Sequence, residues 1–273
     1  MPPVKPEKYT AVLTIAGSDG SGGAGIQADL KTFAALGCYG LSIVTGITAQ
    51  NTRGVRRSSA LSPELVTEQF KALAEDIEIH AVKIGMLSSP GTVQAVAAAL
   101  RSYPPVPVIL DTVLKSSDGM ELVPTEAKAL IIQKLFPLAT LITPNLPEAA
   151  ELAGLESIPA SKNDMEKTAR ILRAERANAV LIKGGHMPGA LCDDYLLSEE
   201  RGEWFSSSRI PTKNTHGTGC TLSSAIAACM AKGLDLHEAV GKGRLFTVEA
   251  LKAGSLFLLG EGTGPLHHFY RWW

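Results

Sequence analysis

The segment 214–221, with sequence NTHGTGCT, carries the residue types best suited to phosphate chemistry. Gly217 and Gly219 flank Thr218, and an apolar run typical of a helix follows. Glycines at a helix start leave backbone N–H groups uncrowded, and the positive end of the helix dipole adds to their attraction for an anion. Cys220 would lie in the first turn, where the same field lowers a thiol pKa and favours the thiolate. The alternative interpretation is a glycine-rich helix start with a small buried cysteine.

A second glycine-rich segment, residues 17–25 (GSDGSGGAG), follows an apolar run at 11–16. Its glycines formally match the dinucleotide pattern GxGxxG. That pattern also requires an acid about 20 residues later, where this chain has Thr-Ala-Gln-Asn at 48–51. We therefore favour a loop that lets backbone and substrate approach closely. Ala24 in the loop and Asp29 on the following helix are then candidate substrate contacts.

Polar residues also follow other predicted strands. Asp111 ends the apolar run 107–111, Glu148 begins a helix, and Lys183 ends the run 179–182. Carboxylates are typical Mg²⁺ ligands in phosphotransfer sites, where waters and phosphates complete the coordination. Each residue also has an ordinary interpretation: Asp111 as a helix cap, Glu148 as a complement to the helix dipole, and Lys183 as a solvated lysine.

The elements that must position these residues alternate between apolar runs and helical patterns. The runs lack the two-residue alternation of half-exposed strands, which predicts an α/β fold with a mostly parallel sheet and helices on both faces. Ligands of such sheets bind at the carboxyl ends of the strands. We predict strands at 11–16, 41–48, 81–85, 107–111, 140–143, 179–182, 195–197 and 204–205, and helices at 26–36, 62–77, 90–102, 125–136, 148–152, 164–176, 222–232 and 236–253.

Composition limits the class of protein. The chain has 273 residues, 45% of them hydrophobic, which predicts one domain over 1–273 with a flexible tail at 1–9. A net charge of −1 argues against nucleic-acid or membrane-surface binding. No apolar run approaches the roughly 20 residues of a spanning helix, and the start has no signal-peptide core. Four cysteines without metal spacing predict a cytoplasmic protein.

The chain resembles the hydroxymethylpyrimidine/phosphomethylpyrimidine kinases of the ribokinase-like superfamily. The resemblance runs in one order through AGSDGSGGAGIQADLKTF, AQNTRGV, KIGML, LDTV, ITPNLPEAAEL, KGGH, NTHGTGCT and GPLHH. It implies a three-layer ribokinase-like fold, a homodimer, and the use of ATP and Mg²⁺. It also implies phosphorylation of 4-amino-5-hydroxymethyl-2-methylpyrimidine and of its monophosphate in thiamine biosynthesis.

Roles follow from matching positions. The resemblance assigns Gln50, in a predicted loop, to hydrogen bonds with the pyrimidine. Met86 and Val113 would form the apolar walls of the ring site, although such residues are as often simply core. The resemblance assigns the phosphates to Asn145, Lys183 and Thr215, Mg²⁺ to Asp111 and Glu148, and the anion hole to Gly217, Thr218, Gly219 and Cys220.

Cys220 would act as the base, with a pKa near neutral, whereas most members of the superfamily carry an aspartate there. One segment departs from the family pattern: Lys115 stands about two places earlier than the lysine of relatives. The nearest alternative is a pyridoxal kinase of the same superfamily, and a more distant one is a non-catalytic sensor that binds a pyrimidine. His216 receives no role from the sequence.

Overall fold

The structure is a computed structural model that describes residues 7–116, 119–199 and 201–273. Within these residues, nine strands form one sheet in the order β3-β2-β1-β4-β5-β6-β7-β8-β9. The pairs from β2 to β7 are parallel, and β3, β8 and β9 join in antiparallel pairs. The strands are β1 (Ala11–Asp19), β2 (Tyr39–Asn51), β3 (Gly54–Ala60), β4 (Ala81–Ile84), β5 (Val108–Leu110), β6 (Leu141–Ile142), β7 (Ala179–Ile182), β8 (Leu191–Ser198) and β9 (Arg201–Ser208).

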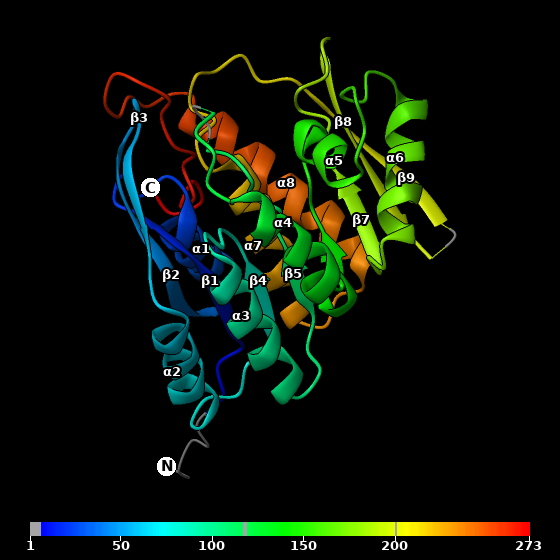
Figure 1. Cartoon of the computed structure of the whole chain (residues 1–273). Coiled ribbons are helices and arrows are strands. Elements are labelled where there is room, and N and C mark those ends of the chain that lie inside the picture. The colour runs from blue at the N-terminus through cyan, green and yellow to red at the C-terminus, as the bar shows by residue number, and fades with distance from the viewer. Residues whose placement is uncertain (1–6, 117–118, 200) are drawn as a thin grey trace.

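Helices cover both faces of this sheet (Figure 1). One group packs on one face and consists of α2 (Pro63–Ala74), α3 (Pro90–Ser102), α4 (Thr125–Leu130), α5 (Leu146–Leu152) and α6 (Lys162–Ala174). The other group consists of α1 (Gly25–Ala35), α7 (Thr218–Ala231) and α8 (Leu236–Gly254). The three-layer α/β architecture predicted from the sequence is confirmed.

The continuous apolar runs are explained by two separate cores. In β1, Val12 packs with α1, α7 and α8, whereas its neighbour Leu13 packs with α2 and α3. Ile109 and Leu110 in β5 divide in the same way. Successive side chains of a strand point to opposite faces, so a strand covered on both sides needs apolar residues at every position.

Three local predictions were wrong. Residues 50 and 51 belong to strand β2, which forms a hairpin with β3, instead of to a loop. The helix predicted over 125–136 is only α-helical to residue 130 and continues as a π-turn and a 3₁₀-turn that contains Pro137. The hairpin β8–β9 is longer than the short strands predicted there.

The chain ends differ in what they contact. Residues 1–6 of the predicted N-terminal tail lie outside the described residues. Lys8 forms a salt bridge with Glu78 (3.2 Å), and the ring of Tyr9 packs on that of Tyr39. In the part of the chain that the structure describes, we find no helix with the length and apolar character needed to cross a bilayer.

Candidate active site

A cavity of about 700 Å³ lies at the carboxyl ends of the parallel strands, between the two glycine-rich segments. The predicted site residues that line it are Ala24, Gln50, Met86, Asp111, Val113, Asn145, Glu148, Lys183, Thr215, Gly217, Thr218, Gly219 and Cys220. Asp29 is the exception. The structure therefore brings all of the predicted site residues except Asp29 together around one cavity.

The loop after β1 is organised by Asp19, a residue that the sequence interpretation missed. Its carboxylate accepts hydrogen bonds from the N–H groups of Ser21 (2.9 Å), Gly23 (3.1 Å) and Ala24 (2.8 Å). It also contacts His216 Nε2 at 2.8 Å. Burial raises the pKa of Asp19, but these hydrogen bonds outweigh burial and hold it well below its usual value. Asp19 therefore joins the first glycine-rich loop to the segment before α7.

Helix α7 begins at this junction. Its N-cap is Gly217, in the left-handed conformation with φ 84°, where a side chain would collide with the backbone of Gly23. The first α-helical hydrogen bond runs from Thr221 N to Gly217 O (2.8 Å). The amides of Gly219 and Cys220 precede that bond and line the cavity. This arrangement is suited to binding an anion.

Asp111 and Lys183 form an ion pair at the centre of the cavity. Lys183 Nζ lies 2.9 Å from Asp111 Oδ1, and Thr143 Oγ1 donates to the same oxygen at 3.1 Å. Burial raises the pKa of Asp111, but the ammonium groups of Lys183 and Lys83 outweigh it and leave that pKa below its usual value. Burial lowers the pKa of Lys183, and the nearby carboxylates, Asp111 first, more than reverse this. Both groups are charged at neutral pH.

Glu148 lies beside this pair and closes a capping box at the start of α5. The Asn145 side chain accepts from Glu148 N, and Glu148 Oε2 accepts from Asn145 N, both at 2.9 Å. Burial raises the pKa of Glu148 to about 7, and the negative charge of Asp111 adds to the effect while Lys183 opposes it. The ordinary interpretation placed Glu148 in the first turn as a complement to the helix dipole; it lies in that turn and also closes the capping box, and the residue lines the cavity.

The expectation of a near-neutral thiol at Cys220 was wrong. Burial raises the pKa of Cys220 to about 11. Lys83 and the N–H of Gly25 lower this pKa, whereas the carboxylates of Asp29 and Asp111 raise it. Loss of water and the two neighbouring negative charges therefore outweigh Lys83 and the Gly25 N–H. In the unliganded protein the thiol is protonated at neutral pH.

The expectation that Asp29 contacts the substrate was also wrong. Its carboxylate is fully buried and forms an ion pair with Lys83, with both oxygens 2.9 Å from Nζ. Thr14 Oγ1 and Ser224 Oγ donate to it at 2.6 and 2.7 Å. Asp29 thus ties α1 to β1, β4 and α7 beneath the cavity. The sequence signal that could have revealed this is Lys83, a charged residue within the apolar strand 81–84.

The residues predicted to contact the ring line the same cavity. Gln50 lies on β2, with its side chain near Thr48 (3.1 Å) and His216 (3.3 Å). Met86 is 8% exposed, and Val113 lies after β5. Both line the cavity, Met86 as a buried residue and Val113 as a partly buried one.

Comparison with known proteins identifies the family of this chain. The family model described as phosphomethylpyrimidine kinase matches residues 19–267. The chain belongs to this family. The hydroxymethylpyrimidine/phosphomethylpyrimidine kinase of Rhizobium meliloti is 46% identical over 261 residues, covering 96% of this chain and 97% of that protein. The Escherichia coli protein of that name is 45% identical over 266 residues, or 97% and 100%. A thiamine biosynthesis bifunctional protein of Geobacter sulfurreducens is 43% identical over 94% of this chain and 52% of its own length.

Two solved structures place the family among related kinases. The phosphomethylpyrimidine kinase from Clostridium difficile 630 has a TM-score of 0.78 and 42% identity, covering 89% of this chain and 99% of that one. The ADP complex of Bacillus subtilis pyridoxal kinase has a TM-score of 0.86 and 33% identity, covering 96% and 98%. The fold is shared with pyridoxal kinases, so the fold alone does not choose the substrate.

Lys115, where this chain departs from the family pattern, lies in a local antiparallel pairing. Lys115 pairs with Glu121 in an isolated antiparallel bridge, and Ser116 N donates to Met120 O at 2.9 Å. Lys115 Nζ lies 3.7 Å from Glu151, and the residue lines the cavity. Residues 117 and 118 of this segment lie outside the described residues.

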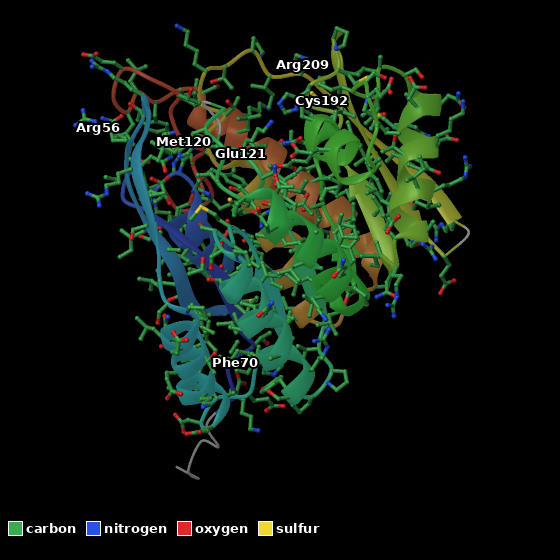
Figure 2. The ribbon with its side chains drawn as sticks, in the orientation of Figure 1. Arg56, Phe70, Met120, Glu121, Cys192 and Arg209 are labelled. Atoms are coloured by element: carbon green, nitrogen blue, oxygen red, sulfur yellow. The ribbon has the colours of Figure 1, made fainter. Side chains whose placement is uncertain are left out.

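Sequence reasoning also missed the residues that hold the far side of the cavity. Arg209 donates to the carbonyl oxygens of Gly185 and Gly189, both at 2.9 Å. Asp194 accepts from Gly184 N (2.8 Å) and from Arg244 Nε (2.6 Å). Figure 2 shows Arg209 and Cys192 at the same end of the molecule as Met120 and Glu121, opposite Phe70. The signal was again a charged residue, Asp194, inside an apolar strand.

Proposed function

We propose that this protein transfers the γ-phosphoryl group of ATP to the hydroxymethyl group of 4-amino-5-hydroxymethyl-2-methylpyrimidine and then to its monophosphate, in thiamine biosynthesis. The observation that carries the proposal is a single cavity lined by an amide suited to contact the ring, Gln50, by an anion-binding helix start and by a lysine, Lys183. The names of the relatives and the ADP complex of the Bacillus subtilis structure support it.

Phosphoryl transfer depends mainly on positioning and on neutralising charge. The amides of Gly219 and Cys220 would hold oxygens of the moving phosphoryl group. Lys183 would share its charge between Asp111 and the phosphates, and Asn145 and Thr215 would bind phosphate oxygens. Because the amides belong to a helix start fixed by Gly217, they need little reorganisation during the reaction.

Asp111 and Glu148 suit a divalent cation of the Mg²⁺ type. Each is a carboxylate that lines the cavity, and each also keeps a fixed partner, Lys183 Nζ or Asn145 N, that sets its orientation. No group of three or more His, Cys, Asp or Glu residues forms a metal cage among the described residues. Two carboxylates are nevertheless sufficient, since Mg²⁺ commonly keeps waters and phosphate oxygens as its other ligands. When bound, it would neutralise phosphate charge.

Cys220 would accept the proton of the attacking hydroxyl. Because burial raises its pKa to about 11, only the small fraction of protein whose thiol has released its own proton to solvent can accept this proton. Phosphoryl transfer through a loose transition state calls for little deprotonation of the nucleophile before the bond forms. We therefore propose that Cys220 acts late, with most of the rate supplied by positioning and charge.

Pyridoxal kinase is the main alternative, since Bacillus subtilis pyridoxal kinase has the same fold. Gln50 favours the aminopyrimidine, because an amide both donates and accepts and so matches an amino group beside a ring nitrogen. The test is a substrate panel with ATP that compares the hydroxymethylpyrimidine, its monophosphate and pyridoxal. Clear preference for pyridoxal would overturn the proposal, and ligand binding without turnover would favour a sensor.

Gln50→Leu provides a second test of the same proposal. Loss of the amide leaves polar atoms of the ring unpaired, each costing about 1–3 kcal/mol, so the pyrimidine KM should rise by at least about tenfold. The ATP KM serves as the internal control and should stay within about twofold. An equal loss of ATP affinity would show that Gln50 does not contact the ring.

We also propose that residues 1–273 form one domain that works as a homodimer in the cytoplasm. The family resemblance supports this proposal. Light scattering of the purified protein measures the mass in solution, and a monomer at micromolar concentration would contradict it.

A further inference from the structure

Asp19 and His216 lie beside Gln50 in the cavity, and their contact determines which nitrogen of His216 carries a proton. Both side chains are buried, and Asp19 Oδ2 lies 2.8 Å from His216 Nε2. The same oxygen accepts N–H groups from Gly23 and Ala24, and its hydrogen bonds hold the pKa of Asp19 low. An ionised carboxylate can only accept hydrogen bonds. His216 Nε2 must therefore carry a hydrogen and donate it to Asp19.

The amide of Gln50 meets this donor. Gln50 Nε2 is placed 3.3 Å from His216 Nε2, so two N–H groups face one another. At its other end, Oε1 lies 3.1 Å from Thr48 Oγ1. The single hydroxyl hydrogen of Thr48 has another acceptor, since Oγ1 also lies 2.9 Å from the carbonyl oxygen of Ser18. That carbonyl oxygen can only accept.

Both mismatches disappear when the amide is turned by 180°. Amide nitrogen and oxygen are assigned from their hydrogen bonds. In the turned amide, Oε1 lies 3.3 Å from His216 Nε2 and shares its single hydrogen with Asp19 Oδ2, while Nε2 donates to Thr48 Oγ1. Two independent neighbours on opposite sides of Gln50 thus require the same orientation.

We propose that His216 and Thr48 fix the orientation of the Gln50 amide, which makes His216 a positioning residue that determines substrate specificity. The inference rests on the proposed function of Gln50 as the ring contact. The fixed amide offers an acceptor on its His216 side and a donor on its Thr48 side. It therefore selects a ring edge with an amino donor next to a nitrogen acceptor, as in a 4-aminopyrimidine. A 4-oxopyrimidine presents the reverse pattern, a carbonyl acceptor next to a ring N–H.

Packing keeps His216 in this position. The added Cβ of an alanine at Gly23 would collide with the imidazole ring, so the ring fills the space that this glycine leaves. His216 N donates to Gly264 O at 3.0 Å, and the residue pairs with Pro265 in a parallel bridge. The ring is held by the loop after β1 on one side, and its backbone by residues 264–265.

The test compares two substrates on each enzyme: 4-amino-5-hydroxymethyl-2-methylpyrimidine and its 4-oxo analogue. The measured quantity is the ratio of their kcat/KM values, in which losses common to both substrates cancel. A site built for one hydrogen-bonding pattern discriminates strongly, so the wild type should prefer the amino compound by about 100-fold or more. His216→Leu should lower this ratio about 10- to 100-fold, because the amide can then turn.

Two further variants separate positioning from packing. His216→Gln keeps an N–H donor near the position of Nε2 and should retain the ratio within about threefold. Thr48→Val is nearly isosteric, removes the second constraint and should lower the ratio less than His216→Leu does. It also keeps the test valid if His216→Leu does not fold.

The outcomes separate this inference from the proposed function. An unchanged ratio in both His216→Leu and Thr48→Val, with an active wild type, would overturn the inference and leave the kinase proposal standing. A wild type that phosphorylates neither pyrimidine would overturn the proposed function itself. Equal loss of ratio in His216→Gln and His216→Leu would show that the ring shape matters and the donor does not.

Discussion

The protonated state of Cys220 leads to a quantitative prediction about its reactivity. With a pKa of about 11, about 3 in 10,000 of these thiols are ionised at pH 7.5, compared with about one in ten for an ordinary cysteine of pKa 8.5. The thiolate is the species that attacks iodoacetamide and displaces its iodide. At equal access, unliganded Cys220 should therefore react about 300-fold more slowly than a model thiol, a cysteine of pKa 8.5 in an unstructured peptide.

The assay follows alkylation of the Cys220 peptide by mass spectrometry between pH 7 and 10.5. The sign follows from the raised pKa: the thiol stays neutral through pH 9, and the rate should rise about tenfold per pH unit up to about pH 10. A rate that levels off below pH 8, or that matches the model thiol at pH 7.5, would refute the reasoning. It would mean that the helix start outweighs burial and the carboxylates of Asp29 and Asp111.

Turnover gives a functional readout of the same group. If the thiolate is the proton acceptor, kcat should rise with pH from 7 to 10 in the wild type. Cys220→Ser should be slower by about 10²- to 10⁴-fold, and its profile should be flat, because a serine hydroxyl does not ionise in this range. Parallel profiles for both enzymes would remove Cys220 from proton transfer.

Three other predictions concern charge and backbone. Lys83→Met leaves a buried carboxylate without its ion partner and should cost about 3–5 kcal/mol of unfolding free energy in urea. Replacing Asp29 by leucine in the same protein should restore most of the lost unfolding free energy. A Lys83→Met variant as stable as the wild type would contradict the ion pair. Asp111→Asn with Glu148→Gln should raise the Mg²⁺ concentration for half-maximal activity by at least about tenfold, with circular dichroism unchanged. An unaltered requirement would exclude both as ligands. Gly217→Ala should abolish turnover. Gly233→Ala, also at positive φ (86°) but facing open space, should cost only about 1 kcal/mol of unfolding free energy. Equal effects of the two substitutions would refute the close contact at Gly217.

Much of the architecture could be predicted from local sequence. Continuous apolar runs such as 11–16 and 179–182 indicated strands buried on both faces, because only a sheet covered by helices on both sides needs apolar side chains at every position. The position of the site followed from the same rule, since the carboxyl ends of parallel strands meet at one edge. Family resemblance added the residue roles.

The wrong predictions about Cys220 and Asp29 share a physical cause, which is that they depend on interactions between segments distant in sequence. The thiol pKa was judged from the helix start alone, but burial raises it, and Asp29 and Asp111, which come from other segments of the chain, add to this rise. Asp29 itself was assigned to the substrate because the sequence shows a carboxylate near a glycine-rich loop, and nothing local shows Lys83 as its partner, 54 residues away.

His216 illustrates the division between sequence and tertiary structure. Its position before GTGC was plain from the sequence, but its partners Asp19 and Gln50 lie 197 and 166 residues away. Local sequence determined which segments would be strands, helices and glycine-rich turns, because backbone preference and the spacing of apolar residues act over a few positions. Tertiary structure alone decided the protonation of Cys220, the ion pair of Asp29 and the orientation of Gln50, because charge, burial and hydrogen bonding depend on which groups meet in space.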